Sequence, residues 1–387
     1  MHARRGFLDR VLTFAFGDDA HPEGARPILG APMLSDWLPH RSYDSSTDIF
    51  YNAGSIGFIV EAAPMVGANE RTGALWSQLL SDTIPSGCEF QALYAQSPSV
   101  GPKITDWILP RLLAKGVFAR AAEHRARWLR RGVWESLSKD APFFLRQHRV
   151  FISIAAPINS SIDVHVLNTV REALLTTLDA VGMPARKVTP VEFIGLINEL
   201  LSPSTDNADK PSDYNTLDPI APQCVRRDLE TNISEHRIIC QSNRFRPTGE
   251  KVDGVPVIGE VIPDKFDLRF FSVRNFPPRF APWDAQLLIG DPFNDKLRHR
   301  GNVFISVTLM FPNQEAANSA ANMKMMRKTS MLDSPSAKYL PMLAEQSQDW
   351  RLALDQIRQG QKLIQCYYCV GVLSPMGQGD ATEKSVK

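Results

Sequence analysis

Hydrophobic residues follow two spacings along the chain, one typical of amphipathic helices and the other typical of strands. Apolar residues that recur every three or four positions predict helices at 7–16, 104–137, 163–181, 190–202, 314–331 and 349–359. Alternating or short continuous apolar runs predict strands at 49–51, 55–62, 88–95, 147–155, 236–240, 255–261, 266–273, 303–311 and 363–373. The pattern predicts an α+β fold, with mixed or antiparallel sheets, packed helices and two or three subdomains.

Several of these elements carry clear start and stop signals. The run 52–54 is a turn of Asn, Ala and Gly between two predicted strands, which indicates a hairpin. Asn69 is placed to cap the helix that follows it. Thr189, Pro190 and Glu192 form a helix start, since the threonine can accept from the third amide and the glutamate can bond back. The helix predicted at 104–137 should be interrupted at three residues, Pro110, Gly116 and Gly132.

The domain organisation follows from the stretches that lack periodicity. Residues 203–222 are rich in Ser, Asp, Asn and Pro, and they mark the best internal boundary. The basic amphipathic helix at 7–16 could lie on a membrane surface or dock on its own domain or a neighbouring subunit. The predicted units are an amphipathic helix and linker at 1–37, an α+β domain at 38–203, a linker at 204–224, a second and incomplete α+β domain at 225–373, and a disordered tail at 374–387.

Composition narrows the class of protein. The chain has 387 residues, 43% hydrophobic and 22% charged, which is ordinary for a soluble globular protein, and its net charge of +1 gives no global attraction to nucleic acid or anionic lipid. No apolar run approaches the roughly 20 residues of a membrane helix. The apolar stretch near the N-terminus is broken by Asp9 and Arg10, so it is not a secretory signal. Five scattered cysteines fit a reducing compartment.

The motif that hydrolyses nucleotides is absent from the sequence. A phosphate-binding loop needs GxxxxGK[ST] between a strand and a helix, because its amides cradle the phosphates and its lysine neutralises their charge. No such string occurs, so we expect no bound cofactor and no ATP hydrolysis by this mechanism.

Two other sets of residues could carry chemistry. Cys366 and Cys369 have the spacing of a redox or zinc pair, but a second pair of ligands is lacking, so they are predicted to be buried cysteines of a strand. The alternative of an unrecognised hydrolase would need an acid/base site assembled from distant positions. The residues for such a site are Asp163, His165, Asp291 and His299.

The segment 38–70 resembles the opening of the F-type TraC family, the large assembly ATPases of conjugative type IV secretion systems. The matching residues are Leu38-Pro39, Arg41-Ser42-Tyr43-Asp44, Phe50, Asn52, Ser55-Ile56-Gly57-Phe58, Glu61, Pro64 and Gly67-Ala68-Asn69-Glu70. The resemblance implies a role in pilus assembly and DNA transfer. In that family the ATP-binding motor lies C-terminal to such a region, so the chain is expected to correspond to the amino-terminal region without the motor, inactive by itself.

The resemblance also implies partners and a location. It implies docking to inner-membrane channel proteins of the secretion system, self-association, and a cytoplasmic position at the inner face of the membrane, with peripheral membrane contact. Three surfaces are candidates for these contacts, and nucleic acid is the less expected partner. They are the turn with Arg41, Tyr43 and Asp44, the helix face with Arg127, Arg130 and Arg131, and the loop with Phe276, Phe280 and Trp283. A stand-alone module that binds nucleic acid or a membrane through the arginine face is the alternative.

Overall fold

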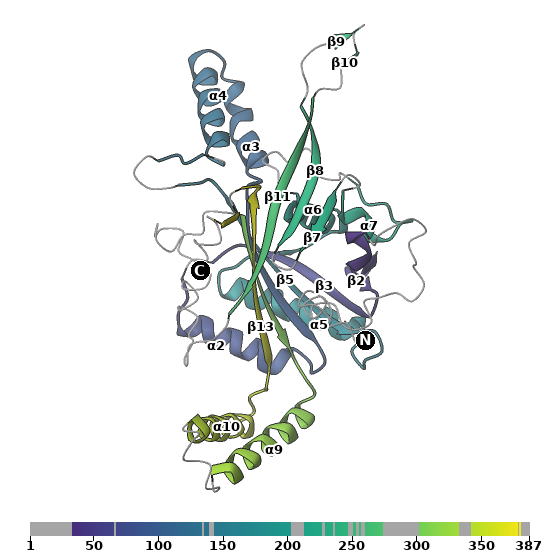
Figure 1. Cartoon of the computed structure of the whole chain (residues 1–387), viewed down its shortest axis with the longest axis vertical. Coiled ribbons are helices and arrows are strands. Elements are labelled where there is room, and N and C mark those ends of the chain that lie inside the picture. The colour runs from purple at the N-terminus through teal and green to yellow at the C-terminus, as the bar shows by residue number, and fades with distance from the viewer. Residues whose placement is uncertain are drawn as a thin grey trace.

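The structure is a computed structural model. It describes residues 33–380 except 66, 134, 139–142, 203–212, 227–228, 235–236, 247–250, 253–254, 257–259, 274–301, 333–341 and 378. Its centre is one long antiparallel sheet with the strand order β1-β2-β3-β5-β4-β12-β13-β11-β8-β7, in which β6 also pairs with β3 (Figure 1). A separate small hairpin joins β9 and β10. The α+β class predicted from the sequence is confirmed.

The strands are β1 (His40–Asp44), β2 (Ile49–Asn52), β3 (Ser55–Ala62), β4 (Glu89–Ser97), β5 (Gln147–Pro157), β6 (Ala185–Lys187), β7 (Glu230–Ile233), β8 (Ile238–Arg246), β9 (Lys251–Val252), β10 (Val255–Pro256), β11 (Glu260–Ser272), β12 (Asn302–Met310) and β13 (Gln365–Pro375). The helices are the short 3-10 helix η2 (Leu34–Trp37), α2 (Glu70–Gln78) with the π-helical turn η3 (Leu79–Thr83), α3 (Gly101–Leu112), α4 (Gly116–Arg131), α5 (Val164–Ala180), α6 (Pro190–Leu201), α7 (Ile220–Cys224), α9 (Gln314–Leu332) and α10 (Met342–Arg358).

The local signals of the sequence act as predicted. The Asn69 side chain accepts a hydrogen bond from the Thr72 amide at 2.9 Å and caps α2. Thr189 and Glu192 form the reciprocal capping box of α6. One predicted break is wrong, because α3 continues through Pro110 to Leu112. Pro110 is exposed and lies in the last turn of its helix, where water can solvate the carbonyl that loses its partner.

Two predicted strands have different bounds in the structure. Strand β11 runs without a break from Glu260 to Ser272, so it takes in the end of the strand predicted at 255–261 and nearly all of the one predicted at 266–273, whereas Val255–Pro256 form the separate strand β10. Pro263 does not end it, although it cannot donate a ladder hydrogen bond, and it is paired opposite Asn243 of β8. The long pairing with β8 supports the strand through this position, and the pairing with β13 on the other side begins only at Phe266.

The sheet separates two hydrophobic cores. Along β5, Ile152 and Ile154 contribute to the core beneath α2 and α5, whereas Phe151 contributes to the core with α6 and α7. This division follows from the alternation of side chains along a strand. On the neighbouring strand β3, Phe58 is 1% exposed and packs in the first of these cores.

Gly57 of β3 allows the close approach of β5. A Cβ atom at this position would lie 2.5 Å from the Ile154 carbonyl oxygen and 2.9 Å from Ala155 Cα, both of them backbone atoms. The glycine within the segment that resembles the TraC family therefore has a structural explanation, since only a residue without a side chain fits there.

Two units of the same plan form the middle of the sheet. In the first, β4 leads through the hairpin of α3 and α4 into β5, its antiparallel neighbour; in the second, β12 leads through α9 and α10 into β13. Because β4 and β12 are antiparallel neighbours, the two helical hairpins leave opposite ends of the sheet (Figure 1). The sheet is thus a platform with a helical projection at each end.

The domain division proposed from the sequence stays a prediction. Strands from both sides of residues 204–224 belong to the same sheet, since β12 pairs with β4. The helix predicted at 7–16 lies outside the described residues, and the short helix η2 occupies the end of the predicted linker.

Candidate interaction surfaces

The hairpin of α3 and α4, residues 101–131, projects from the sheet as a separate unit, and we call it the basic arm (Figure 1). The two helices pack on each other through a small cluster of their own, which includes the buried residues Ile104 and Ala126. Val100 and Val133 at the base of the arm complete this cluster. The arm is therefore held together by local contacts rather than by the two cores of the sheet.

The tip of the basic arm exposes large apolar side chains. Leu113, Val117 and Phe118 are 80%, 68% and 77% exposed, and they surround the turn that joins the two helices. This turn is tight, because Lys115 and Gly116 both adopt positive φ angles, of 56° and 63°. Exposed apolar side chains gathered in this way usually mark an interaction site.

Positive charge is concentrated in the basic arm. Its 31 residues hold eight of the basic side chains and only two acidic ones, whereas the whole chain has a net charge of +1. The basic residues are Lys103, Arg111, Lys115, Arg120, Arg125, Arg127, Arg130 and Arg131, and the acidic ones are Asp106 and Glu123. The excess of positive charge is local and would attract an anionic surface to this part of the molecule.

The arginines predicted from the sequence lie on this arm. Arg127, Arg130 and Arg131 are all exposed on α4. Arg131 pairs with Glu135 at 3.3 Å, with both side chains largely in solvent, and Arg130 donates to the Thr105 hydroxyl at 3.3 Å. Such solvated contacts are weak, so they can be exchanged for contacts with a partner. Their role in an interface stays a prediction.

The predicted turn with Arg41, Tyr43 and Asp44 lies on the edge strand β1, where local contacts hold it. The Tyr43 hydroxyl donates to Asp48 at 2.7 Å, and burial together with this carboxylate raises the pKa of Tyr43. Asp44 accepts hydrogen bonds from the side chains of Ser46 and Thr47, which lower the pKa of its carboxyl. These contacts shape the turn between β1 and β2, and an interface role for the three residues is untested.

The remaining predicted residues have different outcomes. Phe276, Phe280 and Trp283 lie outside the described residues, as do Asp291 and His299. Asp163 accepts from the Val166 amide at 2.9 Å and caps α5. The prediction of two buried cysteines is wrong for Cys366, which is exposed near the start of β13, on the opposite side of the strand from the half-buried Cys369.

Two further observations bear on chemistry and on membranes. Within the described part of the chain, no three His, Cys, Asp or Glu side chains gather closely enough to hold a metal ion. No helix among the described residues has the length and apolar content needed to cross a bilayer.

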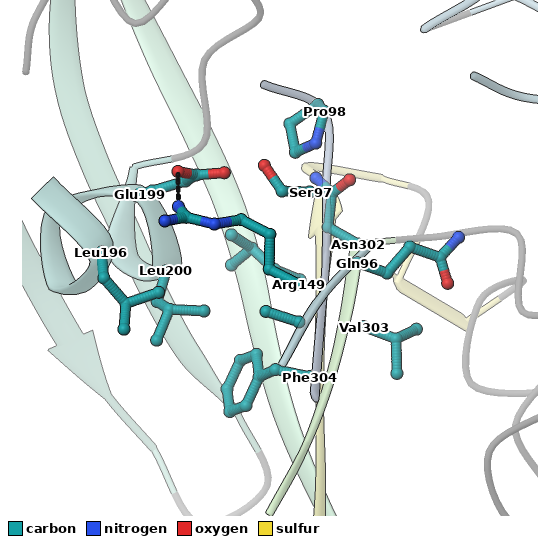
Figure 2. Close-up of a pocket in the computed structure, with 12 residues that line it drawn as sticks. Gln96, Ser97, Pro98, Arg149, Leu196, Glu199, Leu200, Asn302, Val303 and Phe304 are labelled. Carbon is teal, nitrogen blue, oxygen red and sulfur yellow. Dashed lines mark ion pairs between the residues drawn. The ribbon is translucent and has the colours of Figure 1, made fainter. Parts of the chain in front are cut away.

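A buried ionic network joins α6 to the sheet, and no pattern in the sequence predicts it. Arg149 of β5 bonds through Nε to Glu61 of β3 at 2.7 Å, and its Nη1 lies 3.6 Å from the Glu199 carboxylate of α6. Figure 2 shows the Arg149 side chain extending toward Glu199 beside a small hollow lined by β4, α6 and β12. The hollow holds about 20 Å³, room for a single water, so the network is structural rather than a ligand site.

His40, at the start of β1, is a second polar group packed within the fold, and it is half-buried. Its Nδ1 lies 2.9 Å from the Asn52 amide oxygen, and its ring packs edge-on against Phe193 with centroids 4.5 Å apart. Burial lowers the pKa of His40 to about 4, because the imidazolium form would lack the water that stabilises its charge in solution.

Folding stability is therefore expected to fall in mild acid through His40. In the unfolded chain the pKa of this imidazole is near 6.5, so below that pH the unfolded state binds a proton that the folded state does not bind. The contribution of His40 to folding stability is therefore complete above pH 6.5 and is lost as the pH falls toward 4. The free energy of unfolding should drop by about 2 kcal/mol from this residue between roughly pH 7.5 and pH 5. Urea titrations of wild type and His40→Gln at both pH values measure it. His148, whose pKa burial also lowers, contributes equally to both proteins; an equal pH slope in the two would contradict the prediction.

The described part of the chain is thus an antiparallel sheet with a helical hairpin at each end. The family model described as "TraC protein" matches residues 34–387. Protein TraC of Escherichia coli strain K12 is 22% identical over 356 residues, which cover 89% of this chain and 39% of that protein. The chain belongs to the TraC family, as the segment 38–70 predicted, and this relates it to conjugative type IV secretion. It spans well under half the length of this curated relative.

Proposed function

We propose that this chain provides the docking platform of a TraC-type conjugative secretion ATPase. It acts in pilus assembly and DNA transfer by contacting inner-membrane channel proteins and other subunits at the cytoplasmic face of the inner membrane. Catalysis and the ATP cofactor are assigned to the motor of the full-length family and not to these residues. The observation that carries the proposal is the pair of helical hairpins at opposite ends of one sheet.

The two hairpins suit different partners. The basic arm, with its excess of positive charge, would repel a second copy of itself and is assigned to the membrane side. The helices α9 and α10 together have five basic and four acidic residues, so two copies can approach with little net repulsion. Met323 and Met326 of α9 and Leu352 of α10 are 56%, 66% and 57% exposed. Methionine adapts to the shape of a partner, and we assign this hairpin to contacts between subunits.

Deletion of either hairpin tests the proposal, and the strand register shows where to cut. Ser97 of β4 lies directly opposite Gln147 of β5, so a short Gly/Ser turn can replace the segment between them. At the other end, the Gln314 side chain bonds to the backbone of Leu363 at 2.8 Å and 3.1 Å, so a turn can replace the residues between these two.

Each deletion is made in the protein as its gene encodes it and assayed for plasmid transfer and pilus production. We expect both variants to fold, as judged by circular dichroism, and both to abolish transfer. Loss of the basic arm should release the protein from the inner-membrane fraction, and loss of the other hairpin should reduce its assembly state in size-exclusion chromatography. Normal transfer by both folded variants would refute the docking role.

A further inference from the structure

The apolar tip of the basic arm is ringed by cations. Arg111 and Lys115 lie in or beside the turn that carries Leu113, and Arg120 follows Gly116 by four residues, about 6 Å along the helix. All three cations are exposed. The arm therefore ends in an apolar tip, with Lys115 in the connecting turn itself and with Arg111 and Arg120 on the helices next to it.

Resting on the docking role proposed above, we infer that this tip inserts into the head-group region of an anionic phospholipid bilayer. Leu113, Val117 and Phe118 enter the boundary with the acyl chains, while Arg111, Lys115 and Arg120 meet the lipid phosphates. The long stems of these cations can lie along the apolar layer and keep their charged ends among the head groups. The arm is an appendage that touches the bilayer and does not cross it, in the manner of an interfacial helix.

The positive charge and the exposed apolar side chains of the tip together favour an anionic membrane as its partner. A nucleic-acid backbone could pair with the arginines of α4. It would leave Phe118 in water, because a phosphate backbone offers no apolar surface for the three adjacent apolar side chains. An acidic groove on another protein would have to offer apolar pockets as well. The interface of an anionic membrane supplies both features over a broad surface, and its negative potential attracts clustered basic residues.

The geometry leaves the tip accessible for such a contact. The exposed fractions of 68% to 80% at the tip contrast with the buried Ile104 and Ala126, which hold the two helices together at the base. The tip can therefore enter a membrane without any change in the fold of the arm, and substitutions at the tip do not disturb its packing.

Vesicle flotation with the full chain tests the inference. The probes are vesicles of phosphatidylcholine alone and vesicles that also contain phosphatidylglycerol. We expect binding to the anionic vesicles, with affinity that falls as salt is added, and little binding to the neutral ones. Phe118→Ser should weaken binding by roughly tenfold, and Arg120→Glu by at least about fivefold.

Matched control variants lie away from the arm. Leu217→Ser removes an apolar side chain that is 90% exposed, and Arg71→Glu reverses an exposed charge on α2. Both should bind vesicles as wild type does. Circular dichroism should show the same melting behaviour for all four variants, because every changed side chain is exposed.

The outcomes separate this inference from the docking role. Equal binding to neutral and anionic vesicles, no binding to either, or retention of binding by both tip variants would overturn it. Binding of a short DNA duplex that Arg120→Glu weakens and Phe118→Ser leaves unchanged would favour nucleic acid instead. If vesicle binding fails while deletion of the arm still blocks transfer, the docking role stands and a protein partner takes the place of the lipid. If vesicle binding is as expected and the deletion has no effect on transfer, the lipid contact stands alone.

Discussion

Replacing Phe58 with alanine is expected to lower the free energy of unfolding by about 3 to 5 kcal/mol. Phe58 lies on β3 near the centre of the sheet, is 1% exposed, and packs with Ile154 and Leu174 in the core beneath α5. The guanidinium carbon of Arg171 lies 5.9 Å from the centre of its ring. The substitution would leave a cavity that the paired strands on both sides cannot close, because β3 is hydrogen-bonded to β2 and β5.

The measurement is urea unfolding followed by circular dichroism, and the matched control is Phe118→Ala. Phe118 is the same residue type but is 77% exposed at the tip of the basic arm. Its removal should change stability by less than about 0.5 kcal/mol. Similar losses for the two variants would show that the tip packs against the protein, contrary to the structure.

The second large effect is expected from Arg149→Met, which should cost about 3 to 5 kcal/mol of folding stability. Arg149 is the cation between two carboxylates, and the side chains of Arg149, Glu61 and Glu199 are 14%, 16% and 4% exposed. Without it, the buried Glu199 carboxylate loses its salt bridge to β5. Arg186 still pairs with Glu61, so the loss falls mainly on the contact between α6 and the sheet.

Two controls identify the cause of this loss. Arg131→Met breaks the exposed pair with Glu135, where both side chains are more than half in solvent, and it should change stability by less than about 0.5 kcal/mol. Adding Glu199→Leu to Arg149→Met should restore part of the stability, because it removes the buried carboxylate that has lost its salt bridge to Arg149. A double variant as unstable as the single one would argue that packing of the arginine stem, and not charge, is responsible.

Some features of the fold depend only on residues that are close together in the sequence. The caps at Asn69 and Thr189 depend on residues three positions apart, so the pattern alone reveals them. The hairpin between β2 and β3 has the same local origin. Pro110 shows the limit of such signals, because α3 continues through it for two further residues at an exposed position near the end of the helix.

Of the candidate surfaces, one could be predicted from the sequence and another could not. The arginines of α4 could be found from their spacing, and the structure places them on an exposed helix. The apolar tip was missed, because Leu113, Val117 and Phe118 have the helical spacing of core residues. A hydrophobic residue on a helix is normally buried, and only the projection of the arm leaves these three in water.

By itself, the sequence determined the α+β class, most of the helices and strands, and membership of the TraC family, because each depends on short patterns or on a run of matching residues. The tertiary structure alone decided that β12 pairs with β4, that the two helical hairpins leave opposite ends of one sheet, and that Arg149 joins Glu61 to Glu199. Glu61 and Arg149 are 88 residues apart, and many other partners of opposite charge were available to each. Contacts at such separations form only when the whole chain has packed, so no local pattern can specify them.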